Sequence, residues 1–173
     1  IRHNRFIDHG SWGVDLHRVQ SAIVEDNQFL YDAPFQSASS FGIKVDSCYD
    51  SLKVMNNYIG GYTNLGILVD RHSSTANTRA LVANNSIALT GGGNQIRRGL
   101  LIEQCNYVDF FHNSVAVHVP NANSAACYIY ASQNLNLQNN SFNHLGGIYS
   151  MQVVSSSNLN SNYNNLFTTG SVL

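Results

Sequence analysis

Residues 99–115, GLLIEQCNYVDFFHNSV, contain the pattern that decides the fold. The stretch opens on a small residue, continues as an alternating apolar segment, passes through a polar turn into a second short segment, and reaches an Asn two places before another apolar residue. Similar copies, the last one looser, begin at Gly13, Gly42, Gly66, Ala126 and Gly147. A unit repeated along the whole chain predicts a solenoid in which each copy forms one coil.

The Asn that marks each copy gives the length of one coil. These residues recur every 25 to 30 positions, too short an interval for most propeller blades, and the copies lack the helical pattern of leucine-rich or ankyrin repeats. Apolar and polar residues alternate within each copy, as in β-strands with one buried face. We therefore predict one all-β domain over residues 1–173, a right-handed parallel β-helix of six to seven three-strand coils. The marking residues are Asn27, Asn57, Asn85, Asn113, Asn140 and Asn165, with Asn4 as the remnant of an earlier copy.

The repeated Asn predicts an internal ladder. A stacked amide can hydrogen-bond its equivalent one coil away, and Asn tolerates the left-handed conformation that a tight turn needs. We expect the preceding residues to share this turn and face outward; they are Asp26, Asn56, Asn84, His112, Asn139 and Asn164. The apolar residues that follow should start the third strand and point inward; they are Phe29, Ile59, Ile87, Val115, Phe142 and Phe167.

Composition excludes two kinds of partner. Only 11% of the residues are charged and the formal net charge is −1, so no long-range field attracts nucleic acid. No apolar run approaches the roughly 20 residues that cross a bilayer. Residues 1–4 match neither a start nor a signal peptide, so we expect a piece of a larger protein, with flanking domains or self-association through uncapped coil ends.

The three cysteines are expected to be free thiols. Cys48 and Cys105 occupy the same place in copies two coils apart. Coils stack about 4.8 Å apart, so these Cα atoms should be roughly 9 to 10 Å apart, beyond the reach of a disulfide. Cys127 aligns with inward-facing apolar positions, so it is expected to be a buried hydrophobic residue.

The repeats resemble those of the pectate-lyase-like superfamily over almost the whole chain. That superfamily includes polysaccharide lyases, polygalacturonases, mannuronan epimerases, phage tailspikes and surface adhesins, so the resemblance implies a β-helix without deciding the activity. It also implies an extracellular or cell-surface location and a polysaccharide partner. The diagnostic catalytic patterns of polygalacturonases, such as Gly-His-Gly and Arg-Ile-Lys, are absent from the sequence.

Alternation in the first strand of each copy predicts two outward rows. The position four residues after the opening small residue is occupied by His17, Asp46, Asp70, Glu103, Tyr130 and Met151. The position two residues after it is occupied by Asp15, Lys44, Leu68, Leu101, Tyr128 and Tyr149. Arg71 and His72 follow in the next turn, so carboxylates, bases and aromatic rings should share one wall.

These rows carry the candidate chemistry. Asp46, Asp70 and Glu103 could supply a general acid and base, because stacked carboxylates approach the separations used by glycosidases, and Arg71 and His72 would assist charge on the substrate. In a lyase version no cofactor beyond a calcium ion bridging Asp46 and Asp70 is needed. Contacts to sugar are assigned to His17, Lys44, Tyr128, Tyr130 and Tyr149, since aromatic faces bind sugar rings.

Three functions follow from the same rows. The leading hypothesis is a secreted or surface-attached domain that contacts polysaccharide along the wall. The second is a polysaccharide lyase, hydrolase or epimerase that uses the stacked carboxylates. The third is a structural stalk, adhesin or tailspike segment, in which the polar rows are ordinary surface ion pairs.

Overall fold

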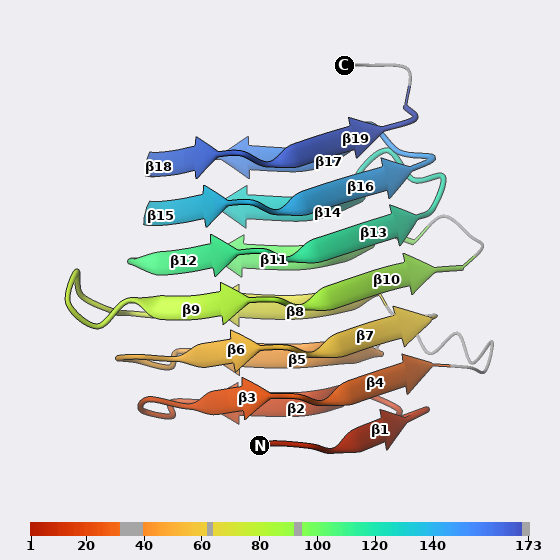
Figure 1. Cartoon of the computed structure of the whole chain (residues 1–173). Coiled ribbons are helices and arrows are strands. Elements are labelled where there is room, and N and C mark those ends of the chain that lie inside the picture. The colour runs from red at the N-terminus through yellow and green to blue at the C-terminus, as the bar shows by residue number, and fades with distance from the viewer. Residues whose placement is uncertain (32–39, 62–63, 92–94, 171–173) are drawn as a thin grey trace.

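The computed structural model describes residues 1–31, 40–61, 64–91 and 95–170, and these residues form parallel strands stacked along one axis (Figure 1). Each full coil contributes one strand to each of three sheets. The first sheet contains β2 (Trp12–His17), β5 (Phe41–Asp46), β8 (Leu65–Asp70), β11 (Arg98–Glu103), β14 (Ala125–Tyr130) and β17 (Tyr149–Val154). The second contains β3 (Ile23–Glu25), β6 (Lys53–Met55), β9 (Ala80–Ala83), β12 (Val108–Phe111), β15 (Gln133–Gln138) and β18 (Ser157–Asn162). The third contains β1 (Arg5–Ile7), β4 (Gln28–Tyr31), β7 (Tyr58–Gly61), β10 (Ser86–Thr90), β13 (Ser114–His118), β16 (Ser141–Leu145) and β19 (Asn165–Thr168).

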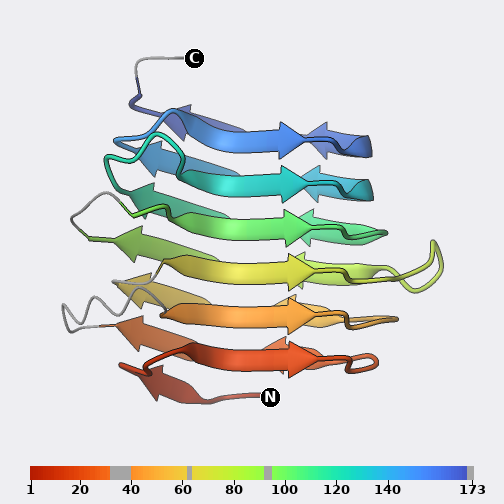
Figure 2. The same cartoon turned by 180° about the vertical axis from the view of Figure 1, so that it is seen from behind.

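The coils rise as a right-handed helix. From β2 through β3 and β4 to β5, the chain makes one right-handed turn around the axis, as both views show (Figures 1 and 2). Right-handed connections are the ones that parallel strands favour. The predicted fold class is confirmed, and the described residues contain no helix. In particular, no described helix has the length and hydrophobicity of a membrane span.

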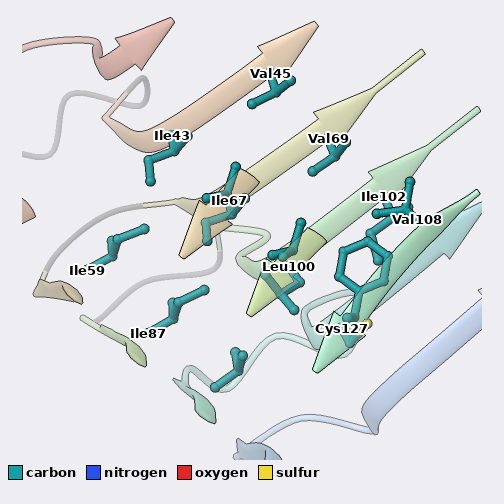
Figure 3. Packing of buried hydrophobic residues seen from close by; sticks show 14 of the residues in the cluster. Ile43, Val45, Ile59, Ile67, Val69, Ile87, Leu100, Ile102, Val108 and Cys127 are labelled. Atoms are coloured by element: carbon teal, nitrogen blue, oxygen red, sulfur yellow. The ribbon is translucent and has the colours of Figure 1, made fainter. Parts of the chain in front are cut away.

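The core consists of inward rows in which equivalent residues of successive coils lie over one another (Figure 3). Ile43 pairs with Ile67, which pairs with Leu100, and Leu100 pairs with Cys127. All four side chains are at most 1% exposed. Close stacking also explains the small residue at the second position of the first-sheet strands. At Gly66, for example, an added Cβ would lie 2.5 Å from the carbonyl oxygen of Gly99 in the next coil.

The Asn ladder is a continuous file of hydrogen bonds inside the corner between the second and third sheets. Each Oδ1 accepts from the backbone N–H and from the Nδ2 of the Asn one coil earlier, at 2.9–3.1 Å. Each Nδ2 also donates to a backbone carbonyl, as Asn85 does to Val54 at 2.9 Å. Buried amides are thereby satisfied at every step.

The ladder ends at Asn164, so the prediction of Asn165 as its last member is wrong. Asn164 accepts from Asn140, whereas Asn165 opens β19 and pairs with Ser141. The register of this coil therefore shifts by one residue. Phe167 consequently points outward, and Leu166 takes the inward position opposite Phe142.

The left-handed conformation belongs to the residue before each ladder position, not to the ladder Asn itself. Asp26, Asn56, Asn84, His112, Asn139 and Tyr163 all have φ between 55 and 57°. This residue turns the corner and exposes its side chain, while the following Asn directs its amide inward. Non-Asn residues such as Tyr163 accept the conformation because the flanking strands are held by their neighbours.

A second column of side chains, which the sequence analysis did not anticipate, fills the corner after the first sheet. It consists of Val19, Cys48, His72, Cys105, Ser132 and Ser156, which precede residues paired across successive coils. The Cys48 Sγ accepts from the Val19 N–H at 3.4 Å, the Ser132 Oγ from the Cys105 N–H at 3.0 Å, and the Ser156 Oγ from the Ser132 N–H at 3.1 Å. We call this the corner column.

All three cysteines are free and buried, as predicted. The Cys105 thiol also donates to the carbonyls of Val69 and Glu103, at 3.2 and 3.1 Å. Burial raises the pKa of the Cys105 thiol to about 12 and raises that of Cys127 as well. These thiols are structural donors and packing groups, not nucleophiles.

Candidate functional site

The outer face of the first sheet carries three rows of side chains, one residue per coil. The leading row contains Trp12, Phe41, Leu65, Arg98, Ala125 and Tyr149; the middle row contains Asp15, Lys44, Leu68, Leu101, Tyr128 and Gln152; the trailing row contains His17, Asp46, Asp70, Glu103, Tyr130 and Val154. Strand pairing in unbroken parallel register puts each member directly beside its equivalent in the next coil, at about 4.8 Å.

Asp46 is the most heavily engaged group of the trailing row. It is 6% exposed, and its Oδ1 accepts from the Nη2 of Arg71 at 2.7 Å and from the Oγ of Ser47 at 2.8 Å. His17 and Lys44 lie 3.3 and 3.7 Å from its Oδ2. Burial acts to raise the pKa of Asp46, but the hydrogen bonds from Arg71 and Ser47, with the nearby cations, outweigh burial and hold the pKa at about 2.

Asp70 and Glu103 have the opposite electrostatics. Burial raises the pKa of Asp70, and the charge of Asp46 raises it further against the opposing effect of Arg71, whose Nη2 lies 3.2 Å from Asp70. Burial likewise raises the pKa of Glu103, with the charge of Asp70 as the next cause. One row therefore combines an anion that persists at low pH with two carboxyl groups that take up protons more readily than usual.

The Arg71 guanidinium lies between Asp46 and Asp70, the two carboxylates that a calcium ion would bridge in the lyase hypothesis. Its Nη2 contacts carboxylate oxygens of both residues. Arg71 reaches them because its left-handed backbone conformation, with φ of 48°, turns the chain directly after β8. Among the residues that the structure describes, no group of three or more His, Cys, Asp or Glu side chains is arranged to hold a metal ion.

His72 does not share the wall with Arg71, contrary to its assignment in the sequence analysis. It belongs to the corner column, is 1% exposed, and its Nε2 lies 2.7 Å from the Oγ of Ser74 and 3.1 Å from the carbonyl oxygen of Asp50. Burial lowers the pKa of His72 despite the opposing contact with Asp50. Arg71 points to the outer face and His72 to the interior, because the chain turns the corner between them.

The aromatic cluster of the wall is smaller than expected. Tyr128 and Tyr130 lie on β14 in the middle and trailing rows, and Tyr130 is 39% exposed. Tyr149 pairs with Ala125 in the leading row, and Met151 pairs with Cys127 and packs against the core. Counting from Gly147 misplaced both residues, because Ser150, three positions later, takes the place of the small residue in this coil.

The leading row is the part of the wall that sequence reasoning missed. The rings of Trp12 and Phe41 stack with their centroids 4.2 Å apart, and Leu65, Leu68 and Leu101 form a separate apolar cluster beside them on the outer face. A groove of about 260 Å³ is lined by Phe41, Asn64, Leu65, Ile96, Arg98 and Leu101. The available signal was the apolar or aromatic residue before the small residue, in Trp12, Phe41 and Leu65.

Comparison of the chain with models of known protein families, with curated proteins and with solved structures returned no match. The geometry of the wall is therefore the basis for assigning a function to the chain.

Proposed function

We propose that the chain is a secreted or cell-surface domain that binds polysaccharide along the outer face of its first sheet. The observation that carries the proposal is the unbroken register of the trailing and middle rows. It lines up charged groups from Asp46 to Glu103 with the rings of Tyr128 and Tyr130 along one face. A linear polymer suits this surface because the binding groups repeat along the solenoid axis.

The rows supply the contacts that sugar recognition uses. Tyr130 offers an exposed ring that can pack against the apolar face of a pyranose. Asp70, Glu103 and Lys44 offer charged hydrogen-bonding groups for hydroxyls and for charged substituents. The likeness of the coils to the pectate-lyase-like superfamily supports the same class of ligand, as an analogy of fold.

Titration of the protein with acidic and neutral oligosaccharides, followed by NMR or calorimetry, tests the proposal. We expect at least one glycan to bind at millimolar concentration or below, and Tyr130→Ala to weaken it about tenfold. Tyr163→Ala is the matched control, because Tyr163 is 87% exposed but lies at the corner before β19, away from the wall. An absence of binding at millimolar concentration, or equal losses in both variants, would contradict the proposal and favour a structural stalk.

A second candidate function is hydrolysis, elimination or epimerisation of the bound glycan. It is favoured by the separation of pKa values within one row, since Asp46 is held at about 2 while the pKa values of Asp70 and Glu103 are raised. Such a separation is how active sites assign acid and base roles. Asp70 or Glu103 would donate the proton, Asp46 would stay ionised, and Arg71 would balance charge.

The catalytic candidate has its own test. Any activity detected on a glycan that binds should fall by at least about 100-fold in Asp70→Asn or Glu103→Gln, while binding is retained. Full activity in both variants would remove the catalytic assignment and leave the binding proposal intact. A calcium-dependent version requires the ion to displace Arg71, so Arg71→Ala should then bind calcium more tightly than the unsubstituted protein by calorimetry.

A further inference from the structure

The groove on the leading row combines an apolar lining with a guanidinium that no described carboxylate approaches within ion-pair distance. Phe41, Leu65, Ile96 and Leu101 supply the apolar surface, and Arg98 is the one charged residue in the lining. The Arg98 guanidinium lies over the Tyr128 ring, with its Cζ 4.0 Å from the ring centroid. Among the described residues no carboxylate lies within ion-pair distance of Arg98, and its buried Nε has no hydrogen-bond partner.

The other cations of the wall differ from Arg98 in this respect. Lys44 contacts Asp15 and Asp46 at 3.5 and 3.7 Å, and Arg71 contacts two carboxylates. A partly buried guanidinium without an ion pair is complementary to an anionic acceptor supplied from outside the chain. The groove is therefore complementary to an anionic oxygen group joined to an apolar body.

We infer that this groove binds a small carboxylate that carries an apolar ring. The carboxylate accepts from Arg98, and the ring packs between Ile96, Leu65 and the Phe41 side chain that stacks on Trp12. A volume of about 260 Å³ admits one ring with a short acidic arm and is at the lower limit of ordinary ligand pockets. This site goes beyond the proposed function, because it holds a small molecule on the leading row and needs no polysaccharide on the trailing row.

The chain carries its own reporter for this site. Trp12 is the single Trp in the sequence, and its indole stacks on Phe41 at the groove. Titration with phenylacetate should change the Trp12 fluorescence in a saturable way, with a Kd on the order of 1 mM for a ligand of this size. Phenylacetamide, which has nearly the same shape without the charge, should bind at least about tenfold more weakly, and 2-phenylethylammonium should not bind.

Three variants distinguish charge recognition from apolar contact. Arg98→Gln should weaken phenylacetate at least about tenfold and leave phenylacetamide unchanged, which removes the difference between the two. Ile96→Ser should weaken both ligands by a few fold, because Ile96 is exposed and contributes only apolar surface. Arg5→Gln, at an exposed Arg in β1 on another sheet, should leave both affinities unchanged.

Several outcomes would overturn the inference. These are equal affinity for phenylacetate and phenylacetamide, no fluorescence change up to 20-fold above the expected Kd, or unchanged phenylacetate binding in Arg98→Gln. If Arg98→Gln unfolds, judged by circular dichroism, the acid and amide comparison on the unsubstituted protein and on Ile96→Ser still decides the question. Binding of oligosaccharides to the trailing row is measured separately, so failure of one proposal leaves the other standing.

Discussion

At the scale of single residues, Asn85 illustrates how one amide supports two neighbouring coils. Its Oδ1 accepts from the N–H and the Nδ2 of Asn57, and its Nδ2 donates to the carbonyl of Val54 and to the Oδ1 of Asn113. Removing such a side chain leaves buried groups on both sides without partners, which costs more than the bonds themselves.

Asn85→Ala should therefore lower the free energy of unfolding by about 3–5 kcal/mol, measured by urea denaturation. Asn165→Ala should change it by less than about 0.5 kcal/mol, because Asn165 is exposed and its amide has only a 3.5 Å contact with the Oγ of Ser141. Equal losses of stability in the two variants would indicate that Asn165, and not Asn164, belongs to the ladder.

Sequence could predict the ladder at every earlier coil but not at the last. In Asn56-Asn57, Asn84-Asn85 and Asn139-Asn140 the second Asn enters the ladder, so counting favoured Asn165 in the last such pair, Asn164-Asn165. The structure selects Asn164 because Tyr163 takes the left-handed corner. Two adjacent Asn residues are equivalent in sequence, and only the positions of the flanking strands distinguish them.

In the trailing row, the charges of Asp46 and Asp70, which lie side by side in neighbouring coils, are predicted to have opposite effects on stability as the pH changes. The pKa of Asp46 is lowered to about 2, so Asp46 stabilises the fold above its unfolded pKa of about 3.9, and this contribution is lost as the pH falls toward 2. Asp46→Asn should lower stability at pH 7 by about 2 kcal/mol. The pKa of Asp70 is raised, so its ionised form costs stability at neutral pH, and the cost disappears as the pH falls through the folded-state pKa.

Asp70→Asn should thus raise the Tm at pH 7, where Asp46→Asn lowers it, and the benefit should vanish below about pH 4. Thermal denaturation of the two variants and the unsubstituted protein between pH 3 and 7 measures both effects. A lower Tm for Asp70→Asn at pH 7 would mean that the ion pair with Arg71 outweighs burial and repulsion at this position.

At the scale of elements, the corner column shows that a backbone turn can be held by small polar side chains. Cys48, Ser132 and Ser156 each accept a hydrogen bond from the backbone N–H of the equivalent residue one coil earlier, and His72 occupies the same place in its own coil. Sequence aligned Cys48 with Cys105 correctly, because each lies six residues after the small residue of its copy. His72 lies six residues after Gly66, so the same count places it in the column; its residue type, not its position, led to its assignment to the wall.

Burial of the three thiols, two of which lie in the corner column, predicts that they are unreactive in the folded protein. With its pKa at about 12, Cys105 at pH 8 carries roughly 10³-fold less thiolate than an ordinary Cys, so alkylation by iodoacetamide should be slower by at least this factor. Cys127, fully buried, should behave similarly. Mass spectrometry should find all three cysteines modified only after denaturation. Rapid labelling of Cys105 in the native protein would show that the corner column opens.

At the scale of the whole molecule, burial is greatest in the middle coils and lowest in the last one. Phe110 on β12 is fully buried, whereas Leu166 on β19 is 48% exposed although it faces inward. A solenoid has only nearest-neighbour coil contacts, so an inward residue in the last described coil is covered on one side.

Phe110→Ala should therefore lower the free energy of unfolding by about 3–5 kcal/mol, and Leu166→Ala by less than about 1 kcal/mol. Hydrogen exchange should follow the same order, with slow amides in β11 to β13 and fast amides in β17 to β19. Equal protection along the axis would indicate that the β17 to β19 coil is covered by another surface.

Repeat spacing and alternation were sufficient for the fold class, the core rows and the trailing row as far as Tyr130. They failed for the leading row, because the copies were aligned from the small residue onward and the residue before it was left out. The groove also depends on Asn64 and Ile96, which lie in connections of different length and sequence. Residues outside the repeated unit have no equivalents in other copies, so no periodic argument could locate them.

The constant strand register also bears on how long such a molecule can be. Successive ladder Asn residues are 30, 28, 28, 27 and 24 positions apart from Asn27 onward, yet every strand meets the next in unbroken register, so the connections absorb the differences. A chain lacking residues 86–113 would bring Ser114 to the place that Ser86 now occupies, with the amide file uninterrupted. The solenoid can thus gain or lose whole coils, each of which changes its length along the axis by about 4.8 Å. Duplication or deletion of one repeat in the gene would therefore change the length of the protein without disturbing the remaining coils.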